Sequence, residues 1–172
     1  MILDSPFAAM TTRASGRPRP APRGFTLIEI MVVLVIIGLL AALAVPGLRR
    51  AKRNAQNNRI VSDFRVFSQA FETYALQNGF WPNSAGAGAV PTAPVSMAGD
   101  FRTSAWQATT PIGGRWNWDR DNFGFSAGIS ISGLTCTDEQ LVEIDAKLDD
   151  GDLGTGRFFK AAADRVCLVV EP

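Results

Sequence analysis

Histidine is absent from this 172-residue chain, and cysteine occurs only twice. Without histidine, the chain cannot form a Ser-His-Asp triad, a histidine general base or a histidine metal ligand. Two cysteines are too few for a zinc site without histidine, and Cys136 and Cys167 do not form a Cys-x-x-Cys pair. Because no catalytic constellation remains, we expect that the protein is not an enzyme.

The chain also lacks an excess of either charge, since 17 basic residues face 16 acidic ones and the formal net charge is +1. This balance gives no reason to expect a nucleic-acid partner. The charges are unevenly placed, because residues 1–24 contain four arginines, one aspartate and four prolines among small residues. This segment has too little apolar content to fold, and we expect it to be a disordered cytoplasmic leader.

One long hydrophobic run is present at residues 25–45, which read FTLIEIMVVLVIIGLLAALAV. A helix of this length spans about 30 Å, which is the thickness of a bilayer core. Arginines precede the run, so the positive-inside rule keeps the N-terminus in the cytoplasm. We therefore expect one transmembrane helix, with the rest of the chain outside the cytoplasm.

Glu29 distinguishes this run from an ordinary anchor. A charge near the membrane centre costs on the order of 3 kcal/mol and usually has a partner. Cleavage after Gly24 would create a new amino group on Phe25, four residues before Glu29. Such an amine and the carboxylate could pair within one helix or between neighbouring helices. Glu29 would also complement the dipole at the start of the helix.

The stretch GFTLIE at residues 24–29, followed by the apolar run with Gly38 and Pro46, resembles the prepilin signal of type IV pilins and type II secretion pseudopilins. The resemblance implies a prepilin peptidase that cuts after Gly24 on the cytoplasmic face and N-methylates Phe25. It also implies that Glu29 guides the docking of the subunit into a filament, near the Phe25 amine of a neighbouring subunit.

Two alternatives concern the N-terminal region. A leader of 24 residues is long for this family, and a translation start at Met10 instead of Met1 would give a more typical leader of 15 residues. The second alternative is a Sec signal peptide, because residues 42–44 form an Ala-x-Ala pattern at the end of the apolar run. The length of the run and the presence of Glu29 argue against it.

A second helical segment continues the first. Pro46 removes one backbone hydrogen bond, but residues 48–78 contain neither proline nor glycine. Apolar residues recur there at spacings of 4, 3, 4 and 3, which predicts a buried helix face. They are Ile60, Phe64, Phe67, Phe71 and Tyr74. Since Gly79 is suited to end the helix, we expect one helix from about Phe25 to Asn78.

Four basic residues directly follow the apolar run, namely Arg49, Arg50, Lys52 and Arg53. They could form a solvated helix face or contact lipid headgroups. The alternative is a set of salt bridges between filament subunits. Positive charge on this side runs against the positive-inside rule, but the leader arginines and the resemblance favour the orientation given above.

The remainder of the chain carries strand patterns. Apolar residues alternate with Gly or Ser over residues 123–132, residues 115–118 alternate in the same way, and the polar residues 119–122 between them predict a hairpin turn. Trp116 and Trp118 share one face of their strand. We expect them to pack on the helix, with a ligand or partner groove as the alternative.

A capping box at residues 137–140 predicts a short helix, and residues 165–170 predict a last strand. The order of long helix, hairpin, short helix and strand indicates an α+β fold, in which a small antiparallel sheet packs on the second half of the long helix. This agrees with the pilin family.

An extracytoplasmic location permits a disulfide between Cys136 and Cys167, with two free buried thiols as the alternative. Four aspartates also cluster around Gly151, namely Asp145, Asp149, Asp150 and Asp152, and the last three could hold calcium. The resemblance favours calcium, because major pseudopilins have a calcium site in their C-terminal loops. An ordinary acidic turn is the other interpretation, and no other cofactor is expected.

Four segments are expected: a cleaved leader (1–24), a transmembrane helix (25–45), the soluble half of the long helix (46–79), and a loop with the C-terminal antiparallel sheet (80–172). The resemblance implies a precursor subunit of a filament, foremost a type II secretion pseudopilin acting in protein export. Its partners would be the prepilin peptidase, other pilin or pseudopilin subunits and the inner-membrane assembly platform. It would be a single-pass inner-membrane protein with a periplasmic C-terminal domain.

Two further hypotheses are a type IV pilus subunit, acting in adhesion, motility or DNA uptake, and a membrane-anchored module that binds a ligand through its tryptophan-rich face. A secreted enzyme behind a Sec signal would be a third, but no nucleophile motif supports it.

Overall fold

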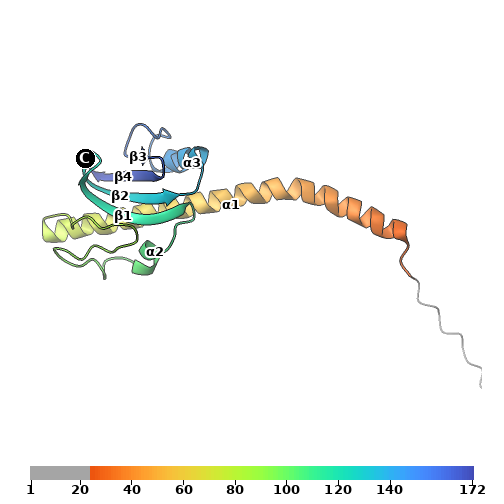
Figure 1. Cartoon of the computed structure of the whole chain (residues 1–172), viewed down its shortest axis with the longest axis horizontal. Coiled ribbons are helices and arrows are strands. Elements are labelled where there is room, and N and C mark those ends of the chain that lie inside the picture. The colour runs from red at the N-terminus through yellow and green to blue at the C-terminus, as the bar shows by residue number, and fades with distance from the viewer. Residues whose placement is uncertain (1–23) are drawn as a thin grey trace, which may run out of the picture. The chain divides into compact units, whose positions relative to one another are not determined.

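The computed structural model describes residues 24–172 (Figure 1), so the predicted leader lies outside the described residues except for Gly24. The elements in chain order are α1 (Leu27–Asn78), α2 (Thr103–Gln107), β1 (Gly113–Asn122), β2 (Phe125–Leu134), α3 (Asp138–Leu148), β3 (Phe158–Ala162) and β4 (Arg165–Glu171). A long N-terminal helix and a small antiparallel sheet make the fold α+β and pilin-like, which confirms the predicted fold class.

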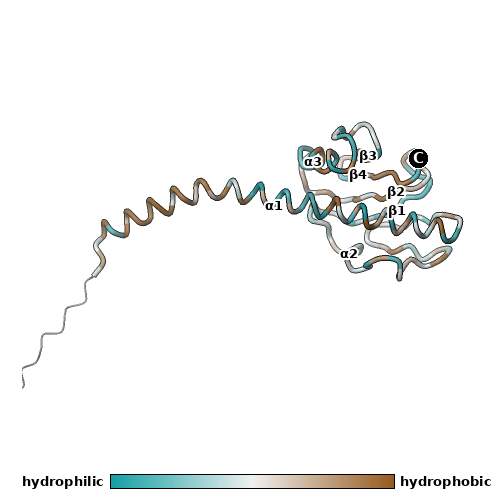
Figure 2. Tube along the Cα trace, turned by 180° about the vertical axis from the view of Figure 1, so that it is seen from behind, coloured by the Kyte–Doolittle hydropathy of each residue, from teal (hydrophilic) through white to brown (hydrophobic). Residues whose placement is uncertain are grey.

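Backbone contacts divide the chain into two units, residues 1–43 and 44–172. In the first unit, every described residue is exposed, and Figure 2 shows this part of α1 as hydrophobic except at its first turn. Among residues 24–172, α1 is the one helix long and apolar enough to cross a membrane. It begins two residues later than predicted and continues through Pro46.

In the second unit, the predicted apolar face of α1 is buried, from Ile60 to Tyr74. Its aromatic rings meet the two tryptophans of β1. The ring centroids of Phe64 and Phe67 lie 4.8 and 5.0 Å from that of Trp116, and Phe71 stacks on Trp118 at 3.8 Å. Both tryptophans therefore belong to the core, as predicted, and the alternative of an open tryptophan groove is excluded.

The sheet has the order β1-β2-β4-β3, and all neighbouring strands are antiparallel. The predicted hairpin is confirmed, but its turn lies at residues 123–124 rather than at residues 119–122. Asn122 pairs with Phe125, so the turn consists of Phe123 and Gly124, which both have positive φ angles (51° and 89°). A two-residue turn of this kind matches the twist of the strands. The polar residues expected in the turn lie in β1 instead.

The predicted disulfide is not formed, and both cysteines are free thiols in the structure. Residues alternate between the two faces of β4, so Val166 and Leu168 join the core beside α1 while Cys167 lies on the other face with Phe125 and Val169. Cys136 packs against the core cluster on the α1 side. The sheet itself therefore separates the two sulfur atoms.

The predicted capping box of α3 is also not formed. Thr137 is the N-cap residue, but its side chain makes no capping hydrogen bond. The Gln140 side chain, which should return to the N-cap, instead donates to Asn57 Oδ1 of α1 at 2.8 Å. Asn57 Nδ2 in turn donates to Glu143 Oε2 at 2.7 Å. The polar residues of α3 thus attach this helix to α1 rather than close its own end.

Candidate functional site

The start of α1 holds the residues that the prepilin resemblance singles out. Thr26 donates to Glu29 Oε2 twice, from its backbone N–H at 2.8 Å and from its hydroxyl at 2.9 Å. The Glu29 N–H donates to Thr26 Oγ1 at 3.3 Å. This reciprocal arrangement is a capping box, with Thr26 at the N-cap. This capping box was not predicted, although the Thr-x-x-Glu spacing of residues 26–29 is its signal in the sequence.

Gly24 and Phe25 precede this cap and are exposed; 83% of Phe25 is accessible. A Cβ atom added to Gly24 would have no neighbour within 4 Å. A larger side chain at this position would therefore not disturb the fold. The junction is accessible in the chain itself, while its cleavage and methylation remain predictions.

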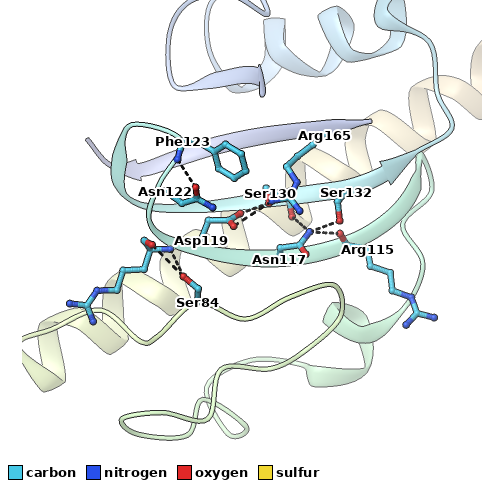
Figure 3. Close-up of polar contacts among 10 residues, drawn as sticks. Ser84, Arg115, Asn117, Asp119, Asn122, Phe123, Ser130, Ser132 and Arg165 are labelled. Carbon is cyan, nitrogen blue, oxygen red and sulfur yellow. Dashed lines mark hydrogen bonds and ion pairs between the residues drawn. The ribbon is translucent and has the colours of Figure 1, made fainter. Parts of the chain in front are cut away.

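A second polar cluster lies on the sheet face that points away from α1 (Figure 3). Asp119 is buried; its carboxylate accepts from the hydroxyl of Ser130 and lies 3.5 Å from the Arg165 guanidinium. Asn117 donates to Ser132 Oγ at 3.0 Å. Because these groups bind one another, the cluster connects three neighbouring strands and leaves no free acid or base.

Cys167 lies on this same face and is fully buried. Burial, followed by the nearby Asp119 carboxylate, raises the pKa of its thiol to about 12. The thiol is therefore protonated at neutral pH and cannot act as a thiolate nucleophile.

The acidic loop after α3 brings carboxylates together, but not the predicted three. Atoms of Asp145, Asp149 and Asp150 that could bind a metal lie within 4.8 Å of one another. Asp152 is not part of this group; its Oδ1 accepts from the Gly154 N–H. Asp145 replaces it because α3 continues to Leu148 and carries Asp145 on its last turn, next to the loop.

Asp145 is the unusual member of this group. Its side chain is fully buried, and neither oxygen accepts a hydrogen bond of normal geometry from any described residue. Burial, and then the charge of Asp150, raises its pKa to about 6, while the nearby Gly151 amide offsets part of the rise. Buried oxygens without donors, facing two more carboxylates, fit the oxygen ligands that Ca²⁺ prefers.

The other two carboxylates are held in place by the loop. Asp149 accepts from the backbone N–H groups of Arg157 and Phe158. Asp150 accepts from the Asp152 N–H at 2.9 Å and the Thr155 hydroxyl at 2.8 Å, and these bonds lower its pKa. Asp150 is thus ionised and fixed beside Asp145.

Comparison with known protein families supports the predicted prepilin signal at the start of α1. The family described as the prokaryotic N-terminal methylation motif matches residues 19–45. This range contains the Gly24–Phe25 junction, Glu29 and the whole apolar run. The resemblance to the prepilin family is therefore confirmed.

Curated relatives come from two kinds of assembly. The chain is 46% identical over 66 residues to the type II secretion system core protein G of Klebsiella michiganensis, and 48% identical over 62 residues to that of Escherichia coli. These matches cover 38% and 36% of this chain and 46% and 43% of the relatives. The type IV major pilin protein PilE1 of Neisseria gonorrhoeae is 34% identical over 92 residues, which are 54% of this chain and 41% of the pilin.

The chain thus spans half or less of the length of the curated relatives it matches. No solved structure matches. Together, the motif and the apolar helix indicate a chain anchored in the inner membrane by its N-terminal helix.

Proposed function

We propose that this chain is the precursor of a filament subunit, foremost a type II secretion pseudopilin that acts in protein export. The observation that carries this proposal is the capped start of α1. A methylation motif leads into an apolar run whose one carboxylate, Glu29, is held at the first turn of α1 by Thr26. The proposed role is structural and requires no catalysis by this chain.

Processing would change the partners of Glu29. Cleavage after Gly24 gives Phe25 a free amine next to the Thr26 cap, at the end of the helix where Glu29 already sits. In a filament, apolar helices of other subunits would surround this carboxylate, and an unpaired charge there would cost several kcal/mol. The Phe25 amine of a neighbour would relieve this cost, so docking in the correct register would be favoured.

The finer partners and the orientation belong to the same proposal. Arginines of the leader favour a cytoplasmic N-terminus, where a prepilin peptidase would cut and methylate the chain. The folded unit would then lie in the periplasm. Other pilin or pseudopilin subunits and the inner-membrane assembly platform would be its partners.

Similarity to a type IV major pilin keeps a pilus subunit as the second candidate. A membrane-anchored binding module loses its main support, since Trp116 and Trp118 are 1% and 0% exposed.

We also propose that the acidic loop binds calcium. Asp145, Asp149 and Asp150 would hold the ion, which would neutralise three clustered carboxylates and fix the loop against the end of α3. The unpartnered oxygens of Asp145 support this proposal over an ordinary acidic turn.

The test of the filament role is Glu29→Leu, with Glu72→Leu as a control that removes an exposed carboxylate from the folded unit. Both variants should reach the membrane in wild-type amounts, because insertion and folding do not use Glu29. Filament assembly or secretion should fall sharply for Glu29→Leu only, measured by counting sheared filaments or exported cargo. Wild-type assembly by Glu29→Leu would contradict the proposed role.

A further inference from the structure

Basic side chains line one face of α1 just beyond the apolar run. Arg49, Lys52 and Arg59 are spaced by three and seven residues, so they share one face of the helix with Gln56. Together with Thr109 and Pro111, part of this face lines a shallow cavity. Since α1 contains no acidic residue between Glu29 and Asp63, positive charge dominates this segment.

Only part of this charge is neutralised within the folded unit. Arg53 pairs with Glu143 at 3.0 Å and Arg59 pairs with Asp63 at 3.7 Å. Within residues 24–172, Arg49, Arg50 and Lys52 form no ion pair, and all three are exposed. Their charges are therefore available to a partner outside the chain.

The position of these residues along α1 identifies that partner. At about 1.5 Å per residue, Arg49 lies about 6 Å and Lys52 about 10 Å beyond Val45, the last residue of the apolar run. The headgroup layer extends roughly 5–8 Å beyond the hydrocarbon core on each side of a bilayer. Long basic side chains can also bend toward the interface. Arg49 and Lys52 can therefore reach the level of lipid phosphates.

We propose that Arg49 and Lys52, assisted by Arg50, bind the phosphate groups of anionic phospholipids in the leaflet next to the folded unit. This inference rests on the proposed membrane insertion of the apolar run. Anionic lipids are favoured over zwitterionic ones because no carboxylate of this segment is available to balance a cationic headgroup. These contacts have to break when a subunit leaves the bilayer for a filament, so the basic residues set a resistance to extraction.

The test measures lipid preference in the full chain. Wild type, Arg49→Gln/Lys52→Gln and the control Arg102→Gln/Arg115→Gln are purified in detergent with equal amounts of phosphatidylglycerol and phosphatidylcholine. Retained lipids are counted by native mass spectrometry. The control removes the same charge from exposed positions outside α1. Every variant keeps the leader arginines, so differences between variants report on α1.

Wild type and the control should retain phosphatidylglycerol in preference to phosphatidylcholine. Arg49→Gln/Lys52→Gln should lower this ratio by at least about fivefold, since each basic residue at an anionic surface contributes roughly that factor. An equal ratio in all three proteins would overturn the proposal. Displacement of the lipid by millimolar inorganic phosphate would do the same, because it would assign the residues to free phosphate.

Resistance to alkaline extraction from membranes distinguishes the proposed lipid binding from the proposed membrane insertion. A resistant chain without lipid preference would overturn the lipid site and leave the proposed membrane insertion standing. A chain that alkali extracts would overturn both.

Discussion

The two halves of α1 differ in how their apolar residues are spaced and in what surrounds those residues. Residues 27–43 are exposed throughout, with Leu43 79% accessible, although nearly all of them are apolar. In the second half, apolar residues recur every three or four positions and form one face of the helix. This face is buried, and Phe67, for example, is only 2% exposed. Periodic apolar residues build a core inside the chain, whereas continuous apolar residues need an apolar partner outside it.

The polar residues of the two halves differ in the same way. Asn57 is fully buried and satisfied by two side chains of α3 within its own unit. Among residues 24–172, the Glu29 carboxylate is bound only by Thr26, three residues away. The polar contacts of the second half therefore stabilise the folded unit, whereas the proposed role of the first half depends on molecules outside the chain.

The largest effect is expected from Phe67→Ala in the second half. Phe67 packs edge-on against Trp106 and Trp116 at 5.0 Å each, and its truncation should lower the free energy of unfolding by about 3–5 kcal/mol. All four tryptophans lie in residues 81–118, so their fluorescence during urea unfolding of the full chain in detergent reports on this unit.

Two control substitutions test whether only buried residues of the second half contribute to the free energy of unfolding. Val66→Ala removes methyl groups from the neighbouring residue, which is 53% exposed, and Val35→Ala removes them from the apolar half. Both should change the unfolding free energy by less than about 0.5 kcal/mol. A loss for Val35→Ala as large as that for Phe67→Ala would break the division of roles.

A smaller effect is expected from Asp145→Asn. The raised pKa of about 6 means that the folded state favours the protonated carboxyl group. Without calcium, the stability contributed by this proton is fully present below the unfolded pKa of about 4 and is lost as the pH rises through about 6. In chelator at pH 7, the free energy of unfolding of the variant should therefore exceed that of wild type by on the order of 1 kcal/mol.

Calcium should reverse this order at pH 7. Saturating calcium should raise the melting temperature of wild type by several degrees, since about 1 kcal/mol moves the midpoint by roughly 3–6 °C for a unit of this size. The rise should shrink at pH 5, where the Asp145 carboxyl group is protonated, and vanish in Asp145→Asn. Magnesium serves as the ion control, and an equal response of variant and wild type would contradict the site.

The smallest effect concerns an ion pair at the edge of the sheet. Lys160 Nζ lies 2.6 Å from Asp138 Oδ1, but the Asp138 side chain is 62% exposed. Lys160→Gln should lower the unfolding free energy by only about 0.2–1 kcal/mol, and less in high salt. A loss above about 2 kcal/mol would show that surface charge contributes more than this account allows.

Elements with a strong period could be predicted from the sequence. The stripe from Ile60 to Tyr74, the end of α1 near Gly79 and the two inward-facing tryptophans all follow from spacing, and the structure confirms them. Three short features were not predicted, because few residues define each of them. Helix α2 has five residues, strand β3 has five, and the turn at Phe123 carries a bulky residue at positive φ where glycine is usual.

The remaining wrong predictions concern features that depend on contacts between residues distant in the sequence. Gln140 binds Asn57, 83 residues away, instead of capping its own helix. Strand β4 places Cys167 on the sheet face opposite the cluster against which Cys136 packs, so the predicted disulfide is wrong. Asp145 takes the place of Asp152 in the carboxylate group because α3 continues to Leu148 and carries Asp145 beside the loop. Local patterns do not specify such tertiary partners.

The mature N-terminus is the most direct test of the central claim, that the first half of α1 is a processed filament helix. The full precursor is expressed with a prepilin peptidase, recovered from membranes, and its N-terminal peptide is identified by mass spectrometry. Wild type should begin at a methylated Phe25, and Gly24→Val should remain uncut, because a side chain there obstructs the peptidase without disturbing the fold. An N-terminus at Val45, or an uncut wild-type chain, would contradict the account.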